Sequence, residues 1–394
     1  MSQAEPLHPI TLDAPSATAD SGAARFETAP MLDRIRAWVE IESPTTDPDS
    51  VNRMVDAVER EYGGTGALME RVAGRDGFGD HLLARSPWGA GERGILVLSH
   101  LDTVHPVGFI NRLPFKVEGD VAYGPGIYDM KGGAYLACHA LRELLRAGRP
   151  TPLPITHLYV SDEEVGSPTS RALIEAEARK AKYVLVTEPA REGGRVVTAR
   201  KGTARFTMRV TGRPAHSGAR HEDGRSAVAE LARQILTLEG MTDYARGVTV
   251  NVGVIGGGTR ANVVPDEAHA EIDMRVPTAE LAEEMVARVL ALEAQGEGVT
   301  VRIEGGLNRP SYEKDERVAA LFEHARALAA QIGFALKDLK TGGGSDGNFT
   351  AAIAPTLDGL GVDGKGGHTD YEQISISSIV PRARLLHELF LTLE

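Results

Sequence analysis

The stretch ILVLSHLDTVHP, residues 95–106, joins a continuous apolar run to a histidine and an aspartate. A run that is apolar on both faces is typical of a central strand in a sheet covered on both sides. His100 and Asp102 follow at the end of that strand, where buried charge is costly unless it is paired or bound to a metal. The stretch therefore predicts either a structural pair or a ligand site at the end of the strand.

The composition is that of an ordinary soluble globular protein, long enough for two domains. The chain has 394 residues, of which 42% are hydrophobic and 25% are charged. Its 43 basic and 55 acidic residues give a net charge of -12, which argues against nucleic acid and anionic membranes as partners. The single cysteine, Cys138, excludes an internal disulfide and favours a reducing compartment.

The N-terminal segment, residues 1–29, predicts a loosely held arm because Pro, Ala, Ser and Asp dominate it. It lacks the basic and apolar regions of a secretory signal. No apolar run in the chain approaches the roughly 18 residues of a membrane span. We therefore expect a cytoplasmic protein.

The remaining chain alternates between two kinds of pattern. Residues 30–199 and 311–394 alternate helical segments with apolar strands, which predicts an α/β catalytic domain with a mixed, largely parallel sheet flanked by helices. Residues 200–310 contain half-buried strands separated by two amphipathic helices. This second pattern predicts a ferredoxin-like α+β domain inserted into the first.

Acidic and imidazole side chains recur after the predicted strands. Asp129 lies in GPGIYDMKGG, Glu163 and Glu164 in VSDEEVGS, Glu188 in VTEPA, and His368 in GKGGHTDYE. Ligands of open α/β sheets bind outside the carboxyl ends of the strands. Two imidazoles and several carboxylates suit a pair of zinc-like ions.

Each of these motifs also has an ordinary structural explanation. A histidine at a strand end is usually hydrogen-bonded, paired glutamates commonly form a solvated turn, and Asp129 could cap a helix. The GPG and TGGGSDG stretches could cradle a phosphate, but neither has a Walker lysine or a dinucleotide spacing. Packing explains His105 and Tyr128 as well as a site role would, and Cys138, on the helix after Asp129, is expected to be a core residue. Five such motifs occur in order at predicted strand ends, which favours a metal site over separate structural explanations.

These motifs, with GRPAHSG and TGGGSDGN, resemble the co-catalytic dizinc exopeptidase family. That family includes glutamate carboxypeptidase, acetylornithine deacetylase, succinyl-diaminopimelate desuccinylase and the aminoacylases. The resemblance runs from about residue 30 to the C-terminus and is strongest to the glutamate carboxypeptidase branch. It implies a zinc-exopeptidase-like catalytic domain, with the inserted domain acting as a lid and as the surface of a homodimer.

The resemblance also implies a ligand set. Asp129 would bridge two divalent metal ions, for which zinc is expected and manganese or cobalt are alternatives. His100 and Glu188 would bind one ion, and Glu164 and His368 would bind the other. The family often has a cis peptide after the bridging aspartate, so the Asp129–Met130 bond is expected to be cis.

Two further residues would act beside the metals. Residues two apart on a strand face the same way, so the Asp102 carboxylate would accept the N–H of His100 and fix its tautomer. Glu163 would be the general base, which takes a proton from water and passes it to the leaving amine.

The family resemblance extends to three residues of the inserted segment. Arg309, in GLNRPSYE, matches the arginine that holds a substrate α-carboxylate, a task suited to a bidentate guanidinium. Asn262, in ANVVP, resembles a polar residue that reaches the site. His216, in GRPAHSG, would reach the active site of the partner subunit and stabilise the oxyanion. Without the resemblance, Arg309 would pass for a surface arginine and His216 for a loop histidine.

The implied activity is metal-dependent hydrolysis of an amide bond in an N-acyl amino acid or before a C-terminal amino acid. Glutamate at the position of Glu188 favours this, because the family has glutamate there in carboxypeptidases and deacylases. One alternative is a hydrolase that cleaves a carbamoyl or arylamine C–N bond at the same dinuclear site. Another is a binding protein that keeps the fold without the chemistry, but that would have lost ligands that this chain retains.

Overall fold

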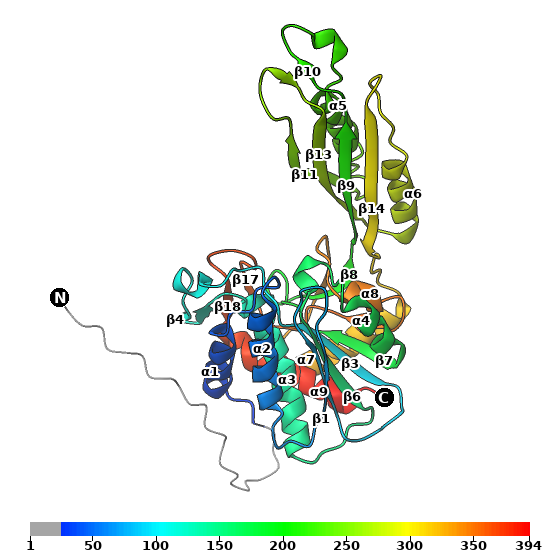
Figure 1. Cartoon of the computed structure of the whole chain (residues 1–394). Helices are drawn as coiled ribbons and strands as arrows, with labels where there is room; N and C mark the ends of the chain where they lie inside the picture. Colours follow the sequence, from blue (N-terminus) through cyan, green and yellow to red (C-terminus); the bar gives the residue numbers. More distant parts are fainter. Residues whose placement is uncertain (1–24) are drawn as a thin grey trace, which may run out of the picture.

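The computed structural model describes residues 25–394, and Figure 1 gives its overall arrangement. Residues 1–24, most of the predicted N-terminal arm, lie outside the described residues. The final residues of that arm are packed, because the Phe26 ring meets the rings of His139 and His387 edge-on at centroid distances of 5.3 and 5.2 Å. The first helix, α1, spans Thr28–Val39.

The centre of the first domain is a mixed six-stranded sheet, as predicted. The inner pairs of the sheet are parallel, and the two strands at one edge are antiparallel to their neighbours. In spatial order the strands are β1 (Leu68–Val72), β2 (His81–Arg85), β6 (Ile155–Val160), β3 (Gly94–His100), β7 (Ala181–Val186) and β16 (Thr356–Leu357).

Helices cover both faces of this sheet, which explains why β3 is apolar throughout. Ile95 and Val97 point into the larger core, and Leu96 and Leu98 point into a second core on the opposite face. Helices of the larger core are α1, α2 (Pro48–Glu61), α3 (Gly132–Arg146), α7 (Glu316–Ile332) and α9 (Ile379–Thr392). The second core receives α4 (Arg171–Arg179) and α8 (Gly347–Thr350).

Two small sheets connect distant parts of the chain at the edge where the central strands end. One is antiparallel, in the order β17 (Gly364–Lys365), β18 (Gln373–Ser375), β5 (Val121–Tyr123) and β4 (Lys116–Glu118). The other pairs β8 (Val196–Arg200) in parallel with β15 (Asp338–Thr341). Because β18 lies on β5, the 366–372 segment is held beside the turn that precedes α3.

A second unit lies between Gly202 and Arg309, and it extends away from the central sheet (Figure 1). Its elements follow the order β9 (Gly202–Thr211), α5 (Ala227–Glu239), β11 (Thr249–Gly257), β13 (Glu267–Val276), α6 (Ala279–Leu290) and β14 (Thr300–Arg309). The antiparallel sheet order, β11-β13-β9-β14, gives the ferredoxin-like βαββαβ arrangement. Buried residues alternate along β13 because the helices cover one face of the sheet only.

A short ladder lies at the far end of this unit, between β10 (Ala215–His216) and β12 (Val263–Val264) (Figure 1). Across residues 25–394, no helix combines the length and the apolar character needed to cross a membrane.

Candidate metal centre and active site

Three of the predicted site segments leave the central sheet at the same edge. His100 is the last residue of β3, Glu163 and Glu164 follow β6, and Glu188 follows β7. Strand β3 lies between β6 and β7 in parallel register, with His100 opposite Val160. The carboxyl ends of all three strands therefore converge, as expected of a ligand site in an α/β sheet.

The turn before α3 brings the fourth segment to this edge. Gly126 has a positive φ of 69°, and a Cβ atom there would approach the Thr103 side chain to 2.6 Å. A Cβ on Gly133 would lie 2.0 Å from the main-chain oxygen of Thr187, so α3 is packed directly against the strand-end loops. The Asp129–Met130 peptide lies within the same turn, between Gly126 and α3, and it is cis, as predicted.

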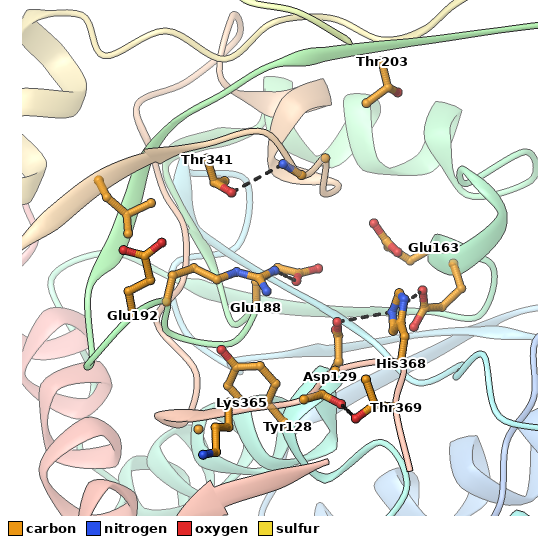
Figure 2. Close-up of a pocket in the computed structure, with 18 of the residues that line it drawn as sticks. Tyr128, Asp129, Glu163, Glu188, Glu192, Thr203, Thr341, Lys365, His368 and Thr369 are labelled. Atoms are coloured by element: carbon orange, nitrogen blue, oxygen red, sulfur yellow. Dashed lines mark hydrogen bonds and ion pairs between the residues drawn. The ribbon is translucent and has the colours of Figure 1, made fainter. Parts of the chain in front are cut away.

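Asp129 lies between the two predicted histidine ligands. Its Oδ1 is 3.2 Å from Nε2 of His100. Its Oδ2 is 3.4 Å from Nε2 of His368, a contact drawn in Figure 2. On one side, Nε2 of His100 is also 3.7 Å from Glu188 Oε1. On the other side, Nε2 of His368 is 3.1 Å from Glu164 Oε2. The Asp129 carboxylate thus contacts both histidines, and each histidine contacts one further carboxylate.

The electrostatics of this cluster fit divalent cations. Burial raises the pKa of Glu164 to about 8, although the hydrogen bond with His368 acts to lower that pKa. Burial also raises the pKa of Glu188 well above its usual range. Hydrogen bonds to Asp129 and Glu164 raise the pKa of His368 to about 11. Burial alone would raise the pKa of Asp129, but its hydrogen bonds with His100 and His368 lower it. Buried carboxylates that repel one another are stabilised by positive charge between them, and the mixed N and O donor set suits zinc-like ions.

Asp102 contacts the site differently from the sequence prediction. Nδ1 of His100 lies 2.9 Å from the main-chain oxygen of Asp102 and 3.6 Å from its carboxylate. The carboxylate instead accepts the main-chain N–H groups of Glu163 and Glu164, each at 3.2 Å, and the Thr45 hydroxyl at 2.7 Å. Donation from Nδ1 leaves Nε2 of His100 free to face the cluster.

Glu163, the predicted base, is paired with Arg309. Nη2 of Arg309 donates to Glu163 Oε1 at 2.8 Å and to Asp346 Oδ1 at 3.0 Å, and its Nε donates to the Ser345 carbonyl at 3.1 Å. Burial raises the pKa of Asp346 to about 7. Arg309 is only 5% exposed, so it is no ordinary surface arginine. In this conformation its guanidinium contacts the base, at the point where β14 re-enters the first domain.

The glycine-rich TGGGSDG stretch is held by a buried ion pair. Arg200 and Asp358 are both fully buried and pair through two hydrogen bonds, at 2.8 and 3.1 Å. Nη1 of Arg200 also donates to the carbonyls of Gly343 and Gly344, each at 3.1 Å. These contacts fix the loop on which Asp346 lies, and Asp346 in turn contacts Arg309.

A cavity of 680 Å³ opens over the ligand cluster. Glu163, Glu164 and Glu188 line it together with the glycine-rich loop and the 364–371 segment (Figure 2). Among the described residues that line this cavity, Glu192 is the one acidic side chain that is neither a predicted ligand nor the predicted base. The cationic lining residues are Arg191, Arg205, Arg275, Arg309, Lys340 and Lys365.

His216 and Asn262 are not brought to this cavity. Both are exposed residues at the far end of the second unit, where the Asn262 carbonyl accepts the N–H of Ser217 at 3.1 Å. Neither is among the described residues that line the cavity of the same chain. Nδ1 of His216 accepts the main-chain N–H groups of Gly218 and Ala219, each at 3.2 Å, which leaves Nε2 as the donor of a neutral ring.

Comparison with known proteins identifies the family of this chain. The family model described as peptidase family M20/M25/M40 matches residues 96–392, about three quarters of the chain. The chain belongs to peptidase family M20/M25/M40. Carboxypeptidase G2 of Pseudomonas sp. (strain RS-16) is 31% identical over 381 residues, which cover 93% of this chain and 91% of that enzyme.

Two solved structures share the fold of this M20 chain. Aminopeptidase PepT from Bacillus cereus aligns with a TM-score of 0.75 at 24% identity, covering 93% of this chain and 98% of that one. An M20 family metallo-carboxypeptidase from Sulfolobus solfataricus aligns with a TM-score of 0.70 at 18% identity, covering 91% and 98%. The chain is therefore a hydrolase of the M20 family, and its described residues hold a candidate metal-binding cluster.

Sequence reasoning missed several residues at the site of this M20 enzyme. Glu372, in the GGHTDYE motif quoted for His368, contacts the turn that carries Asp129. Asp346, in TGGGSDGN, contacts Arg309. Arg191 lies 3.5 Å from Glu188. The motifs pointed to the right segments for Glu372 and Asp346, but only long-range contacts distinguish these carboxylates from solvated ones.

Proposed function

We propose that this M20 enzyme is a dinuclear metallo-carboxypeptidase or N-acyl-amino-acid amidohydrolase, which acts on a substrate with a free carboxylate. The observation that carries the proposal is the position of Asp129, with one carboxylate oxygen toward His100 and the other toward His368. Glu188, beside His100, and Glu164, beside His368, complete two proposed half-sites that share the Asp129 carboxylate. Two divalent ions bound there, for which zinc is expected and manganese or cobalt are alternatives, would polarise the scissile carbonyl and acidify water.

Glu163 is proposed as the general base. It lines the cavity next to the ligand cluster, and its main-chain N–H is fixed by Asp102. Its carboxylate takes a proton from the attacking water and returns it to the leaving amine. The ion pair with Arg309 aligns one oxygen of this carboxylate.

The cavity wall supports an anionic substrate. Its cationic side chains outnumber the acidic ones that are not assigned to the metals or to catalysis. Arg309 remains our candidate for the substrate α-carboxylate, because its guanidinium lies beside the base and can form bidentate contacts. A substrate carboxylate at Arg309 would compete with Glu163 and Asp346 for that guanidinium.

The test is a panel of substrates that share one acyl group. N-acyl glutamate and aspartate are expected to be cleaved faster than N-acyl leucine. Converting the α-carboxylate to a carboxamide is expected to lower kcat/KM by about 10–100-fold, the worth of a charge-assisted hydrogen bond of about 1.5–3 kcal/mol. Steady-state release of the free amino acid measures the first comparison, and release of the amino acid amide from the carboxamide substrate completes the second.

A second set of substrates contains N-carbamoyl amino acids and arylamides. Faster cleavage of these compounds than of every N-acyl amino acid would overturn the carboxypeptidase assignment and favour the alternative C–N hydrolase. Equal rates on the carboxylate and the carboxamide would remove the role proposed for the anionic group.

We also propose that two copies pair through the second unit, which acts as a lid and a dimerisation domain. Strand β11 is an edge strand of its sheet, and Val254 and Ile255 on it are exposed. Helix α5, which contacts β11, exposes Val228 and Leu236. An unpaired edge beside exposed apolar side chains suits a two-fold interface.

Such a dimer gives His216 a function that it lacks within one chain. We predict that His216→Ala lowers kcat by about 10²–10³, because Nε2–H would stabilise the oxyanion in the site of the partner subunit. Asn262 belongs to the same exposed end and would reach that site in the same way.

Complementation checks this assignment. A mixed dimer of His216→Ala and Glu163→Ala subunits holds one site with an intact base that receives His216 from its neighbour. Random mixing is expected to restore roughly one quarter of the activity, since half of the dimers are mixed and each has one competent site. His221→Ala, which removes another exposed histidine of this unit, is the matched control and should retain activity. Mixed dimers that form but stay inactive would exclude a role for His216 in the partner's site.

A further inference from the structure

Glu372 is a buried carboxylate that is saturated with hydrogen-bond donors. It is 1% exposed. Its Oε2 accepts the main-chain N–H of Gly126 at 2.9 Å and the ring N–H of His105 at 3.0 Å. Its Oε1 accepts the main-chain N–H groups of Tyr128 and Asp129, at 2.9 and 2.8 Å. Both oxygens therefore have two donors each, and three of the four donors belong to one turn.

That turn carries the central residue of the ligand cluster. The three main-chain donors come from Gly126, Tyr128 and Asp129. Asp129 thus has its side chain between the two histidines while its own N–H is held by Glu372. A displacement of this carboxylate would move the backbone of Asp129 directly.

Glu372 also belongs to the segment of the second histidine. His368 lies four residues earlier, in the connection between β17 and β18. The main-chain oxygen of Glu372 accepts the N–H of Gly124 at 3.3 Å, which joins the start of the same turn to β18. One residue therefore connects the segment of His368 to the turn of Asp129 through both its main chain and its side chain.

We propose that Glu372 is a positioning residue that sets the place of Asp129 relative to His100 and His368, and so the divalent-metal affinity of the cluster. The proposal rests on the metal-dependent function proposed above. Glu372 is not among the described residues that line the cavity or form the candidate metal-binding groups. Partners of this kind around a ligand set commonly change metal affinity or activity by about 10–100-fold when they are replaced.

The chemistry of the contacts requires a carboxylate at this position. All four groups donate, so both oxygens must accept. A glutamine side chain has nearly the same shape but presents an NH₂ group at one end, which would face donors instead of accepting from them. Glu372→Gln therefore removes the donor-acceptor match while it leaves the packing volume almost unchanged.

The experiment compares divalent-metal binding by chelator-stripped wild-type protein and the Glu372→Gln variant. Titration calorimetry with Zn²⁺ gives the affinities, and the visible absorption of bound Co²⁺ reports the coordination geometry. We expect the variant to bind at least one ion about 10–100-fold more weakly, with an altered Co²⁺ spectrum. In the metal-saturated enzyme kcat should fall while KM stays near its wild-type value.

Glu42→Gln is the matched control. Glu42 is also a glutamate that holds a loop, since it accepts the main-chain N–H groups of Gly108 and Ile110 at 2.8 and 2.9 Å. That loop contains none of the proposed ligands. The Glu42 variant should bind metal with wild-type affinity and spectrum, which separates positioning of Asp129 from general loop stabilisation.

A second variant keeps the test decisive if Glu372→Gln does not fold. His105→Leu removes one of the four donors and none of the main-chain contacts, so it should weaken metal binding in the same direction by a smaller factor. Wild-type affinity and spectrum in Glu372→Gln, or in His105→Leu if only that variant folds, would overturn the inference. If wild-type protein itself bound no divalent ion, the proposed function would fail; if only the variants behaved like wild type, the inference alone would fail.

Discussion

Replacing Glu163 with glutamine is expected to lower kcat by about 10²–10⁴ while both metal ions stay bound. The amide keeps the shape of the carboxylate and can still accept the Arg309 hydrogen bond through its oxygen, but it cannot take a proton from water. The variant should therefore bind substrate with little change in KM. Stopped-assay kinetics and elemental analysis on the same preparation measure the two effects.

The adjacent residue provides the contrast. Glu164→Gln removes a carboxylate that lies 3.1 Å from Nε2 of His368, so it should lower the metal content as well as the rate. A Glu163→Gln variant that kept most of its kcat would show that another group acts as the base. A variant that lost its metal would show that Glu163 is a ligand.

Removing the metals is expected to abolish turnover, and adding Zn²⁺, Mn²⁺ or Co²⁺ back should restore it. Asp129→Asn should prevent this recovery, because each oxygen of the Asp129 carboxylate faces a different histidine. Metal binding should also stabilise the fold, by about 2.7 kcal/mol for one ion at a free concentration 100 times its Kd. Thermal unfolding with and without chelator measures that difference independently of activity.

Asp370→Asn is the control for the Asp129 variant. Asp370 lies two residues from His368, but its carboxylate is half-exposed and pairs with Arg112. This variant should retain both ions and recover activity after reloading. Full activity of the wild-type enzyme in excess chelator, with no bound metal detected, would contradict the dinuclear mechanism.

Local sequence patterns predicted much of the fold. The apolar run before His100 predicted a strand covered on both faces, and β3 does pack against two cores. The alternation after residue 200 predicted half-buried strands, and one face of the second sheet is covered by its two helices. Periodicity is a local property, so one segment suffices to reveal it.

The short strands were not predictable in this way. Strands β17 and β18 have two and three residues, too few for a period to be recognised. Strand β18 depends on pairing with β5, which is more than 200 residues away in the sequence, and β17 pairs with β18 in turn. The antiparallel edge formed by β1 and β2 depends on tertiary pairing in the same way.

The candidate site, like the fold, was predictable from the sequence only in part. The sequence alone showed that acidic and imidazole side chains follow the predicted strands, because residue type and position after a strand are local facts, and the family resemblance implied a ligand set among them. It also indicated the cis peptide at Asp129–Met130 through the family resemblance.

The tertiary structure decided what those side chains face. It turned the Asp102 carboxylate to the 163–164 main chain, paired Arg309 with Glu163, and placed Glu372 under the turn of Asp129. Each of these contacts joins residues 60 or more positions apart, and a charged side chain finds its partner only when folding removes the water that would otherwise solvate it.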